Sequence, residues 1–467
     1  MNDLGGLKMK VAVIGCTHAG TSAIKNVLTL YPDAEIDVFE RNDNVSFLSC
    51  GIALYVGGVV EKAESLFYAS VDGFEDRGIR MHMEHDVVSV NVAKKELEAK
   101  DLKSGEVKHH TYDKLIISTG SWPFTPPIPG FDLDNVVLCK NYDHAKDIIR
   151  RSEHVNHVTV VGGGYIGVEL VEAFEENGKQ VTLVDAESRI LNRYLDQAFT
   201  DPVEQTFRDK GVQLLLNEFV SGFEGDENGK VKKVITNQSE VKTELVIMCI
   251  GFRPSTDLFK GQLEMLPSGA IVVDEFMETS AKDVFAAGDC CAVPYNPTGK
   301  SAYIPLATNA VRMGTIAAQN LVERTVKHPG TQGTSGLKIY NHYIGSTGLT
   351  EDAAKVNDIE ARSVEIKETY RPDFMPENNV IHLKLVYEVG TERVVGAQVI
   401  SDIDLTQVAN TVSIAIANKM TIEQLALSDF FFQPHFNKPV NYLNEVALKA
   451  VQQENALARE AVTAPVK

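Results

Sequence analysis

The sequence predicts an α/β protein with two parallel sheets wrapped by helices and a smaller C-terminal α+β domain. An apolar segment that ends in glycine occurs at residues 10–15 and again at residues 157–162. Each copy precedes a glycine-rich turn, a helical pattern and a second apolar segment that ends in an acidic residue, Glu40 or Asp185. Beyond residue 330, polar and apolar residues alternate, as at 381–387, which is typical of an antiparallel sheet.

Helical periodicity supports each of the two repeats. Apolar residues recur at helical spacing after both glycine-rich turns, which predicts one buried face per helix. Strands that alternate with helices form parallel sheets, because each helix returns the chain to the edge where the previous strand began. The predicted buried faces consist of Ala23, Ile24, Val27 and Leu28 in the first repeat, and of Val168, Leu170, Val171 and Phe174 in the second.

The segments between the repeats predict the domain organisation. Residues 112–120 and 245–251 are apolar strands that each end in a glycine turn. The proline-rich run at 122–130 is unsuited to a helix or a central strand, because proline lacks an amide donor, so we interpret it as a crossover. We expect a discontinuous first domain at 9–125 and 252–328, a second domain at 126–251, and a third at 329–455 with a helix near 405–419.

Composition narrows the function. The chain is 44% hydrophobic and 23% charged, with a net charge of -19. An acidic surface repels phosphate backbones and anionic lipid, so we expect neither nucleic acid nor a membrane as a partner. The six cysteines are dispersed and fit neither a disulfide framework nor a zinc site, which favours a cytoplasmic protein without a metal. Residues 1–8 do not resemble a signal peptide, and Met9 reads like a natural start.

The second glycine-rich turn has the features of a dinucleotide-binding site. The sequence GGGYIG at 162–167 follows a strand and precedes a helix. These glycines allow a tight turn and a close backbone approach to a pyrophosphate at the helix N-terminus. Asp185 lies at the spacing of a carboxylate that binds a ribose 2′-hydroxyl and repels a 2′-phosphate, so NADH is favoured over NADPH.

The first glycine-rich turn departs from this pattern. In GCTHAG at 15–20, Thr17 stands where the middle glycine belongs, and His18 follows it. Glu40 lies at the right distance for a ribose contact, and Gly288 with Asp289 provides a second half-site. We therefore expect a second dinucleotide here, and the fold becomes two Rossmann-like dinucleotide-binding domains plus the α+β domain.

Over residues 9–448 the sequence resembles the FAD-dependent pyridine nucleotide–disulfide oxidoreductases. The two turns, the STG at 118–120 and the segment 279–289 ending in DVFAAGD carry the resemblance. It implies FAD in the first domain, NAD(P)H in the second, and a C-terminal domain that forms a homodimer. The C-x-x-x-x-C pair of the disulfide reductases is missing, because Cys50 in SFLSCG stands alone.

This lone cysteine is similar to that of the single-cysteine branch, which contains NADH peroxidases, water-forming NADH oxidases and coenzyme A-disulfide reductases. The segment FFFQPHFNKP at 430–439 resembles the first two, and Val311, where the peroxidases carry arginine, favours the oxidases. The resemblance implies that NADH reduces O2 to water through a thiolate and sulfenic acid cycle at Cys50. A redox sensor and an electron-transfer reductase are the alternatives from other functional classes.

The implied site residues follow from these motifs. Cys50 is the expected redox centre and His18 its proton-handling partner, and a helix N-terminus with His18 is expected to lower the thiol pKa. Tyr165 is the expected aromatic gate, and Tyr194 an adenine contact. The implied FAD contacts are Gly15, Thr17, Ala19, Gly20, Glu40, Arg41, Ser49, Val88, Thr119, Gly120, Asp289, Leu306, Ala307 and Thr308. The implied NADH contacts are Gly162, Gly164, Tyr165, Ile166, Gly167, Glu169, Asp185, Tyr194 and Gly251.

Overall fold

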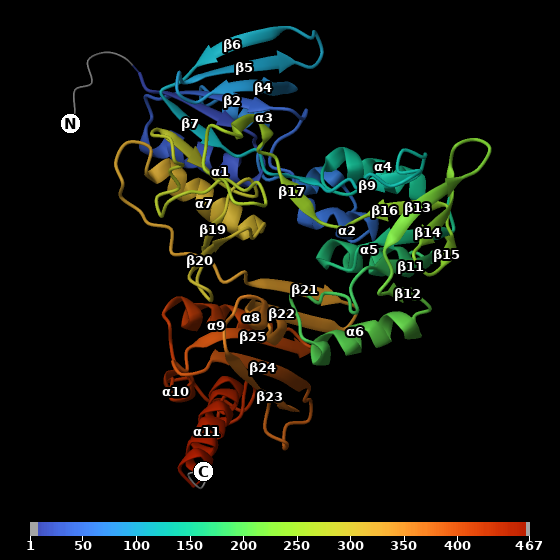
Figure 1. The fold of residues 1–467 in the computed structure, drawn as a ribbon, viewed down its shortest axis with the longest axis vertical. Coiled ribbons are helices and arrows are strands. Elements are labelled where there is room, and N and C mark those ends of the chain that lie inside the picture. Colours follow the sequence, from blue (N-terminus) through green and yellow to red (C-terminus); the bar gives the residue numbers. More distant parts are fainter. Residues whose placement is uncertain (1–7, 464–467) are drawn as a thin grey trace.

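The computed structural model describes residues 8–463, and Figure 1 shows three lobes along the chain. The segment before Met9, which we compared with a signal peptide, lies outside the described residues except for Lys8. Two lobes contain parallel sheets and the third contains an antiparallel sheet. In the described part of the chain, no helix has the length and apolar character needed to cross a membrane.

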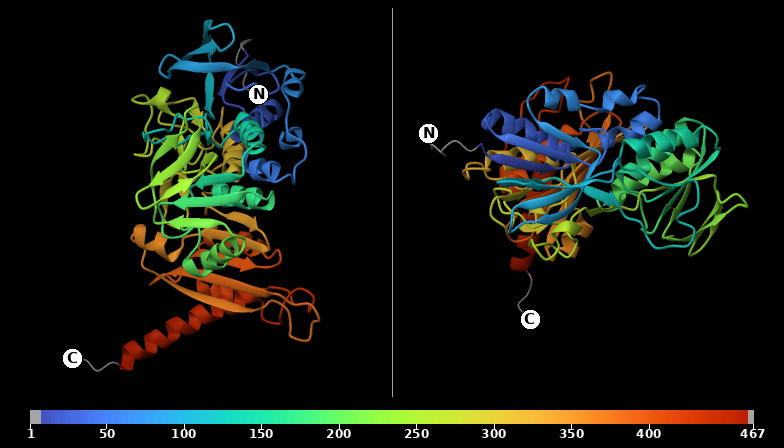
Figure 2. Two further views of the ribbon diagram at one scale, coloured as in Figure 1. Left: turned by 90° about the vertical axis from the view of Figure 1, so that its right-hand side faces the viewer. Right: turned by 90° about the horizontal axis from the view of Figure 1, so that it is seen from above.

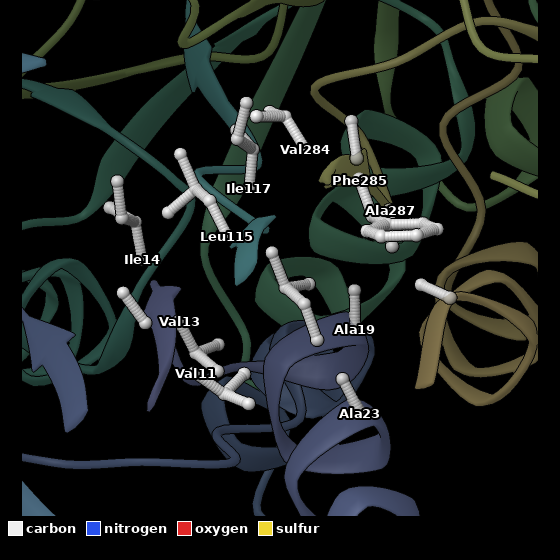
Figure 3. Close-up of a cluster of buried hydrophobic side chains, with 14 of the residues drawn as sticks. Val11, Val13, Ile14, Ala19, Ala23, Leu115, Ile117, Val284, Phe285 and Ala287 are labelled. Carbon is white, nitrogen blue, oxygen red and sulfur yellow. The ribbon is translucent and has the colours of Figure 1, made fainter. Parts of the chain in front are cut away.

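The first parallel sheet has the strand order β18-β7-β1-β2-β3. Its strands are β1 (Lys10–Ile14), β2 (Glu35–Glu40), β3 (Arg80–Met83), β7 (Lys114–Ile117) and β18 (Val284–Ala286). Helices α1 (His18–Leu30) and α7 (Ala307–Gln319) pack against each other and against this sheet. Figure 3 shows Val11, Val13, Leu115 and Ile117 of the strands together with Ala19 and Ala23 of α1 in one apolar core.

The second parallel sheet has the order β12-β11-β10-β16-β9. Strands β10, β11 and β12 therefore neighbour each other as β1, β2 and β3 do in the first sheet. Its strands are β9 (Val136–Leu138), β10 (His157–Val161), β11 (Gln180–Asp185), β12 (Gln213–Leu216) and β16 (Leu245–Met248). Helix α5 (Tyr165–Glu176) packs on β10 and β11, and α6 (Gln197–Asp209) packs on β12. The predicted internal repeat is therefore a repeat of structure.

Each parallel sheet has a three-stranded antiparallel sheet inserted in sequence, between β3 and β7 in the first lobe and between β12 and β16 in the second. In the first lobe this is β4 (His85–Asn91), β5 (Glu96–Asp101) and β6 (Val107–Thr111). In the second it is β13 (Val220–Gly225), β14 (Val231–Thr236) and β15 (Glu240–Lys242). The two lobes are joined by β8 (Ser121–Pro123) and β17 (Phe252–Pro254), which pair only with each other. The prolines of the crossover thus lie outside the central sheets, as predicted.

The C-terminal lobe is an antiparallel sheet of order β21-β22-β25-β24-β23. Its strands are β21 (Ser335–Ile339), β22 (His342–Gly348), β23 (Ala361–Thr369), β24 (Val380–Glu388) and β25 (Val394–Ser401). Helices α9 (Gln407–Ala417) and α11 (Tyr442–Thr463) contribute to one core with this sheet, and Figure 2 shows α11 reaching away from the body. The helix expected near 405–419 is α9.

The alternation in β24 does not mark a solvent-exposed face. Leu383 and Leu385 belong to the core with α9 and α11, while Lys384 on the other face is only 7% exposed. That second face is covered because it meets α6 and the segment before it, which belong to the second parallel lobe. The central part of β24 is therefore buried on both sides.

The remaining elements lie within these lobes or in the segments between them. They are η1 (Ser49–Gly51), α2 (Ile52–Val56), η2 (Ala63–Leu66), α3 (Val71–Glu75), α4 (Tyr142–Ser152), η3 (Asp257–Phe259), β19 (Val293–Tyr295), β20 (Lys300–Ala302), α8 (Glu351–Val356) and α10 (Ile422–Ala426).

Candidate functional site

The two glycine-rich turns have the same backbone. The amide of Gly15 donates to the carbonyl of Phe39 at 2.8 Å, and that of Gly162 donates to Val184 at 2.8 Å. A Cβ on the last glycine of either turn would lie 2.0 Å from the Gly15 carbonyl oxygen at Gly20, or 1.8 Å from the Gly162 carbonyl oxygen at Gly167. A side chain at Gly20 or Gly167 would require the turn and its helix to move apart, because its Cβ would lie well inside contact distance of a backbone oxygen.

The middle position of each turn is open. A Cβ on Gly164 would meet no atom within 4 Å, and the structure places the Thr17 side chain on the surface at the equivalent position. Thr17 is the N-cap residue of α1 and Gly164 that of α5, and no side-chain hydrogen bond caps either helix. Leu306 is the N-cap residue of α7, which also lacks a side-chain hydrogen bond at this end. Three helix N-termini therefore present free amide groups, which favour an anionic group or a carbonyl oxygen.

An acidic side chain supports each turn from the neighbouring strand. A Glu40 carboxylate oxygen accepts from the amide of Cys16 at 2.7 Å, and its other oxygen accepts from the amide of Asn42 at 2.8 Å. Asp185 accepts from Gly163 in the same way and from the amide of Glu187 at 2.8 Å. Burial raises the pKa of both carboxyls. The predicted ribose-binding acids are thus held in matching positions at the ends of β2 and β11.

A polar cluster joins the start of β8 to the segments that follow β9 and β18. Ser121 donates to Asp289 Oδ2 at 2.9 Å, and Lys140 Nζ donates to the Ser121 hydroxyl at 3.0 Å. Lys140 Nζ also lies 3.4 Å from Asp289 Oδ2. Thr119 donates to the carbonyl of Ser255 at 2.7 Å. The Tyr303 hydroxyl, which is buried and has no partner, leaves a polar group available to a bound molecule.

Cys50 lies in η1, directly before α2. It is exposed, whereas four of the other cysteines are buried and one is partly buried, and all six are free. The expected lowering of its thiol pKa is wrong. The surrounding protein desolvates the thiol and the carboxylate of Glu169 repels its charge, and both effects raise the pKa of Cys50. Lys140, which no sequence motif marked, opposes them and lowers this pKa.

His18 begins α1 and is fixed by Tyr68. Its Nδ1 lies 2.9 Å from the Tyr68 hydroxyl, and the two rings stack at 5.8 Å between centroids. Its Nε2 is buried without a partner. Burial lowers the pKa of His18, Asp289 opposes this effect, and Lys140 adds to it, so the neutral imidazole is favoured at neutral pH. Cys50 and His18 thus share Asp289 and Lys140 as charged neighbours.

Tyr165 begins α5, at the position that His18 occupies in α1. Its ring lies 4.2 Å from that of Tyr194 between centroids, tilted by 32°. One helical turn later, Glu169 lines a cavity of about 550 Å³ together with Leu54, Glu172 and other residues. Burial and the charge of Glu172 raise the pKa of Glu169 to about 7.

Other predicted site residues lie around these groups. Val88 occupies a bulge between β4 and β5 and is 40% exposed. Leu306, Ala307 and Thr308 form the N-terminus of α7. The described residues contain no cluster of His, Cys, Asp or Glu that could hold a metal ion. Sequence reasoning missed Lys140 and Tyr68, because neither belongs to a motif and both act through contacts made only in the folded chain.

Known proteins resemble the whole chain. A model of the pyridine nucleotide-disulphide oxidoreductases matches residues 9–314, and a model of their dimerisation domain matches residues 335–442. An NADH oxidase of Enterococcus faecalis is 55% identical over 444 residues, covering 95% of this chain and 100% of that protein. An NAD(P)H coenzyme A polysulfide/persulfide reductase of Pyrococcus horikoshii is 33% identical, covering 92% of this chain and 96% of that protein.

A solved structure shows the same fold. The water-forming NADH oxidase from Lactobacillus brevis bound to NADH matches with a TM-score of 0.94 and 47% identity, covering 97% of this chain and 100% of that chain. The predicted fold class and the predicted family are both confirmed. The chain belongs to the FAD-dependent pyridine nucleotide-disulphide oxidoreductase family.

Proposed function

We propose that this protein is a water-forming NADH oxidase in which the Cys50 thiolate supplies the second pair of electrons to oxygen, by reducing peroxide to water. The single observation that carries this proposal is a lone exposed cysteine at the start of α2, with five other cysteines that are free and more buried. The 55% identical NADH oxidase and the water-forming enzyme of Lactobacillus brevis support it.

The first lobe fits FAD. The N-termini of α1 and α7 have free amides, Glu40 stands at the end of β2, and Tyr303 and His18 present unpartnered polar atoms. Glu40 would bind the ribose, and Asp289 would bind the ribityl chain. We assign residues 9–125 and 252–328 to this FAD domain, 126–251 to the NADH domain and 329–455 to dimerisation. Bound FAD would supply hydride acceptance from NADH and the first reduction of O2, to peroxide.

The second lobe fits NADH. Gly164 leaves room for the pyrophosphate at the N-terminus of α5, and Asp185 would accept bonds from the ribose hydroxyls. The same carboxylate would repel the 2′-phosphate of NADPH. Tyr165 would gate the approach of the nicotinamide, with Glu169 one turn further along α5.

Cys50 would carry the oxygen chemistry that this chain itself performs. Its thiolate attacks one peroxide oxygen, the O–O bond breaks, and a sulfenic acid and, after protonation, one water form. The two electrons of a second NADH then break the S–O bond, which releases the second water and restores the thiolate. The sum is two NADH, two protons and one O2 to two NAD⁺ and two waters. Without a neighbouring thiol, the sulfenic acid persists instead of forming a disulfide.

His18 and Lys140 would manage the protons and charge of these steps. The unpartnered Nε2 of His18 could exchange a proton with peroxide, while Tyr68 holds its other nitrogen. Lys140 would stabilise the thiolate against the desolvation by the surrounding protein and the Glu169 charge that disfavour it. We further propose a cytoplasmic homodimer with NADH and O2 as its small-molecule partners.

The nearest alternatives are an NADH peroxidase and a coenzyme A-disulfide reductase. The relative of 33% identity that reduces coenzyme A polysulfides favours the latter, but the oxidase relative is far more similar. A redox sensor would turn over slowly with saturating NADH and O2.

Replacing Cys50 tests the proposal directly. In Cys50→Ser we expect NADH oxidation to continue while peroxide accumulates to about one per NADH, because the first reduction of O2 does not need the thiol. Cys249→Ser, in a partly buried position, is the matched control and should form water only. If Cys50→Ser also releases no peroxide, the assigned role of Cys50 is wrong.

A further inference from the structure

A row of polar side chains crosses the C-terminal sheet on the face that meets the second lobe. Ser335 of β21 is the register partner of Ser346 of β22, which is the partner of Gln398 of β25, which is the partner of Lys384 of β24. Paired residues of antiparallel strands point to the same face. Ser346, Gln398 and Lys384 are 6%, 1% and 7% exposed, so this row needs partners.

The serine end of the row binds Tyr165. The Tyr165 hydroxyl lies 2.6 Å from Ser335 Oγ and 3.4 Å from Ser346 Oγ, and the two serine oxygens lie 3.2 Å apart. Three hydroxyls from α5, β21 and β22 therefore form one hydrogen-bonded cluster. The cluster connects the first residue of α5 to a different lobe.

The other end of the row binds the segment that carries Tyr194. Gln398 donates to Asp196 Oδ2 at 2.7 Å and accepts from the Asp196 amide at 2.6 Å. Lys384 Nζ lies 3.0 Å from the same carboxylate oxygen. The amide of Leu191, earlier in this segment, donates to the carbonyl of Gly163 at 2.8 Å. Tyr194 is thus held between the sheet and the glycine-rich turn.

We propose that this row is a latch that holds the Tyr165–Tyr194 pair in its closed position, with Ser335 and Ser346 as positioning residues for nicotinamide entry. The inference rests on the proposed function, in which the nicotinamide must displace the Tyr165 ring. Displacement breaks the bond between the hydroxyls of Tyr165 and Ser335, so the latch lowers the affinity for a dinucleotide. It does not affect ligands that lack a nicotinamide, because these leave the ring in place.

Calorimetric titration of the oxidised holoenzyme with NAD⁺ and with ADP-ribose tests the latch. We expect Ser335→Ala to bind NAD⁺ about 2- to 10-fold more tightly, the range of one net hydrogen bond, with unchanged affinity for ADP-ribose. Tyr165→Phe keeps the ring, removes the same bond from the other side and should give the same change. The double variant should add nothing further, because both substitutions remove one interaction.

A matched control lies beside the latch, in β22 and at the residue directly before β21. The hydroxyls of Thr334 and Thr347 are 2.8 Å apart, one position along the chain from Ser335 and Ser346. Thr347→Val removes this bond and should leave both affinities unchanged. Equal NAD⁺ affinity in the wild type, Ser335→Ala and Tyr165→Phe would overturn the latch, as would an equal gain for ADP-ribose. Failure of the proposed function would appear separately, as no anaerobic bleaching of the flavin by NADH in the wild type.

Discussion

The two glycine-rich turns share a backbone and differ in the residue that begins the helix. His18 begins α1 and Tyr165 begins α5, and each ring is fixed through its polar atom by a hydroxyl from another segment. The glycines determine the shape of both turns, because any side chain at Gly20 or Gly167 would collide with a carbonyl oxygen. In the proposed function, the first helical residue therefore distinguishes a turn that serves proton transfer, through His18, from one that serves gating, through Tyr165.

The strongest test of the shared backbone substitutes two glycines of one turn. Gly167→Ala places a Cβ 1.8 Å from the Gly162 carbonyl oxygen, so the turn and α5 must move apart and we expect Tm to fall. Gly164→Ala meets no atom within 4 Å and should fold normally. Its KM for NADH should rise, because the added methyl group occupies the approach of the pyrophosphate. Thermal unfolding of both variants checks this, and a stable Gly167→Ala would contradict the account.

The second test compares the proposed roles of the Asp185 and Glu40 carboxylates. Asp185→Ala removes the proposed ribose acceptor, so we expect the ratio of kcat/KM for NADH over NADPH to fall roughly 10- to 100-fold, the effect of hydrogen bonds to a charged group. Glu40→Ala should instead weaken FAD retention, with little change in this ratio. Glu187→Ala, an exposed neighbour of Asp185, is the charge control. An unchanged ratio in Asp185→Ala would show that another residue selects the dinucleotide.

The smallest expected effect concerns the charges around Cys50. Lys140 lowers the pKa of the Cys50 thiol and Glu169 raises it. Lys140→Gln should therefore shift the pH dependence of Cys50 alkylation by iodoacetamide to higher pH, and Glu169→Gln should shift it to lower pH. Lys146→Gln, a partly exposed lysine on α4, is the control. Shifts of the same sign in both variants would contradict the electrostatic assignment.

Much of the scaffold could be predicted from local sequence. The glycine turns, the acids at the ends of β2 and β11, and the helix α9 each follow from patterns within a few residues. The sign of the Cys50 pKa shift could not be predicted, because the sequence shows the following helix and His18 but neither the desolvation of the thiol by the surrounding protein nor the approach of Glu169 from α5. Lys140 and the serine end of the latch were missed for the same reason: their partners Asp289 and Tyr165 lie far away in the chain.

The ratio of O2 consumed to NADH oxidised tests the central claim most directly. Reduction to water uses about half a mole of O2 per mole of NADH, by electron counting, and leaves no peroxide. We predict this ratio for the wild-type enzyme in air-saturated buffer, unchanged by added catalase. A ratio of about one, which catalase lowers toward one half, would show that peroxide is released and that Cys50 does not complete the reduction.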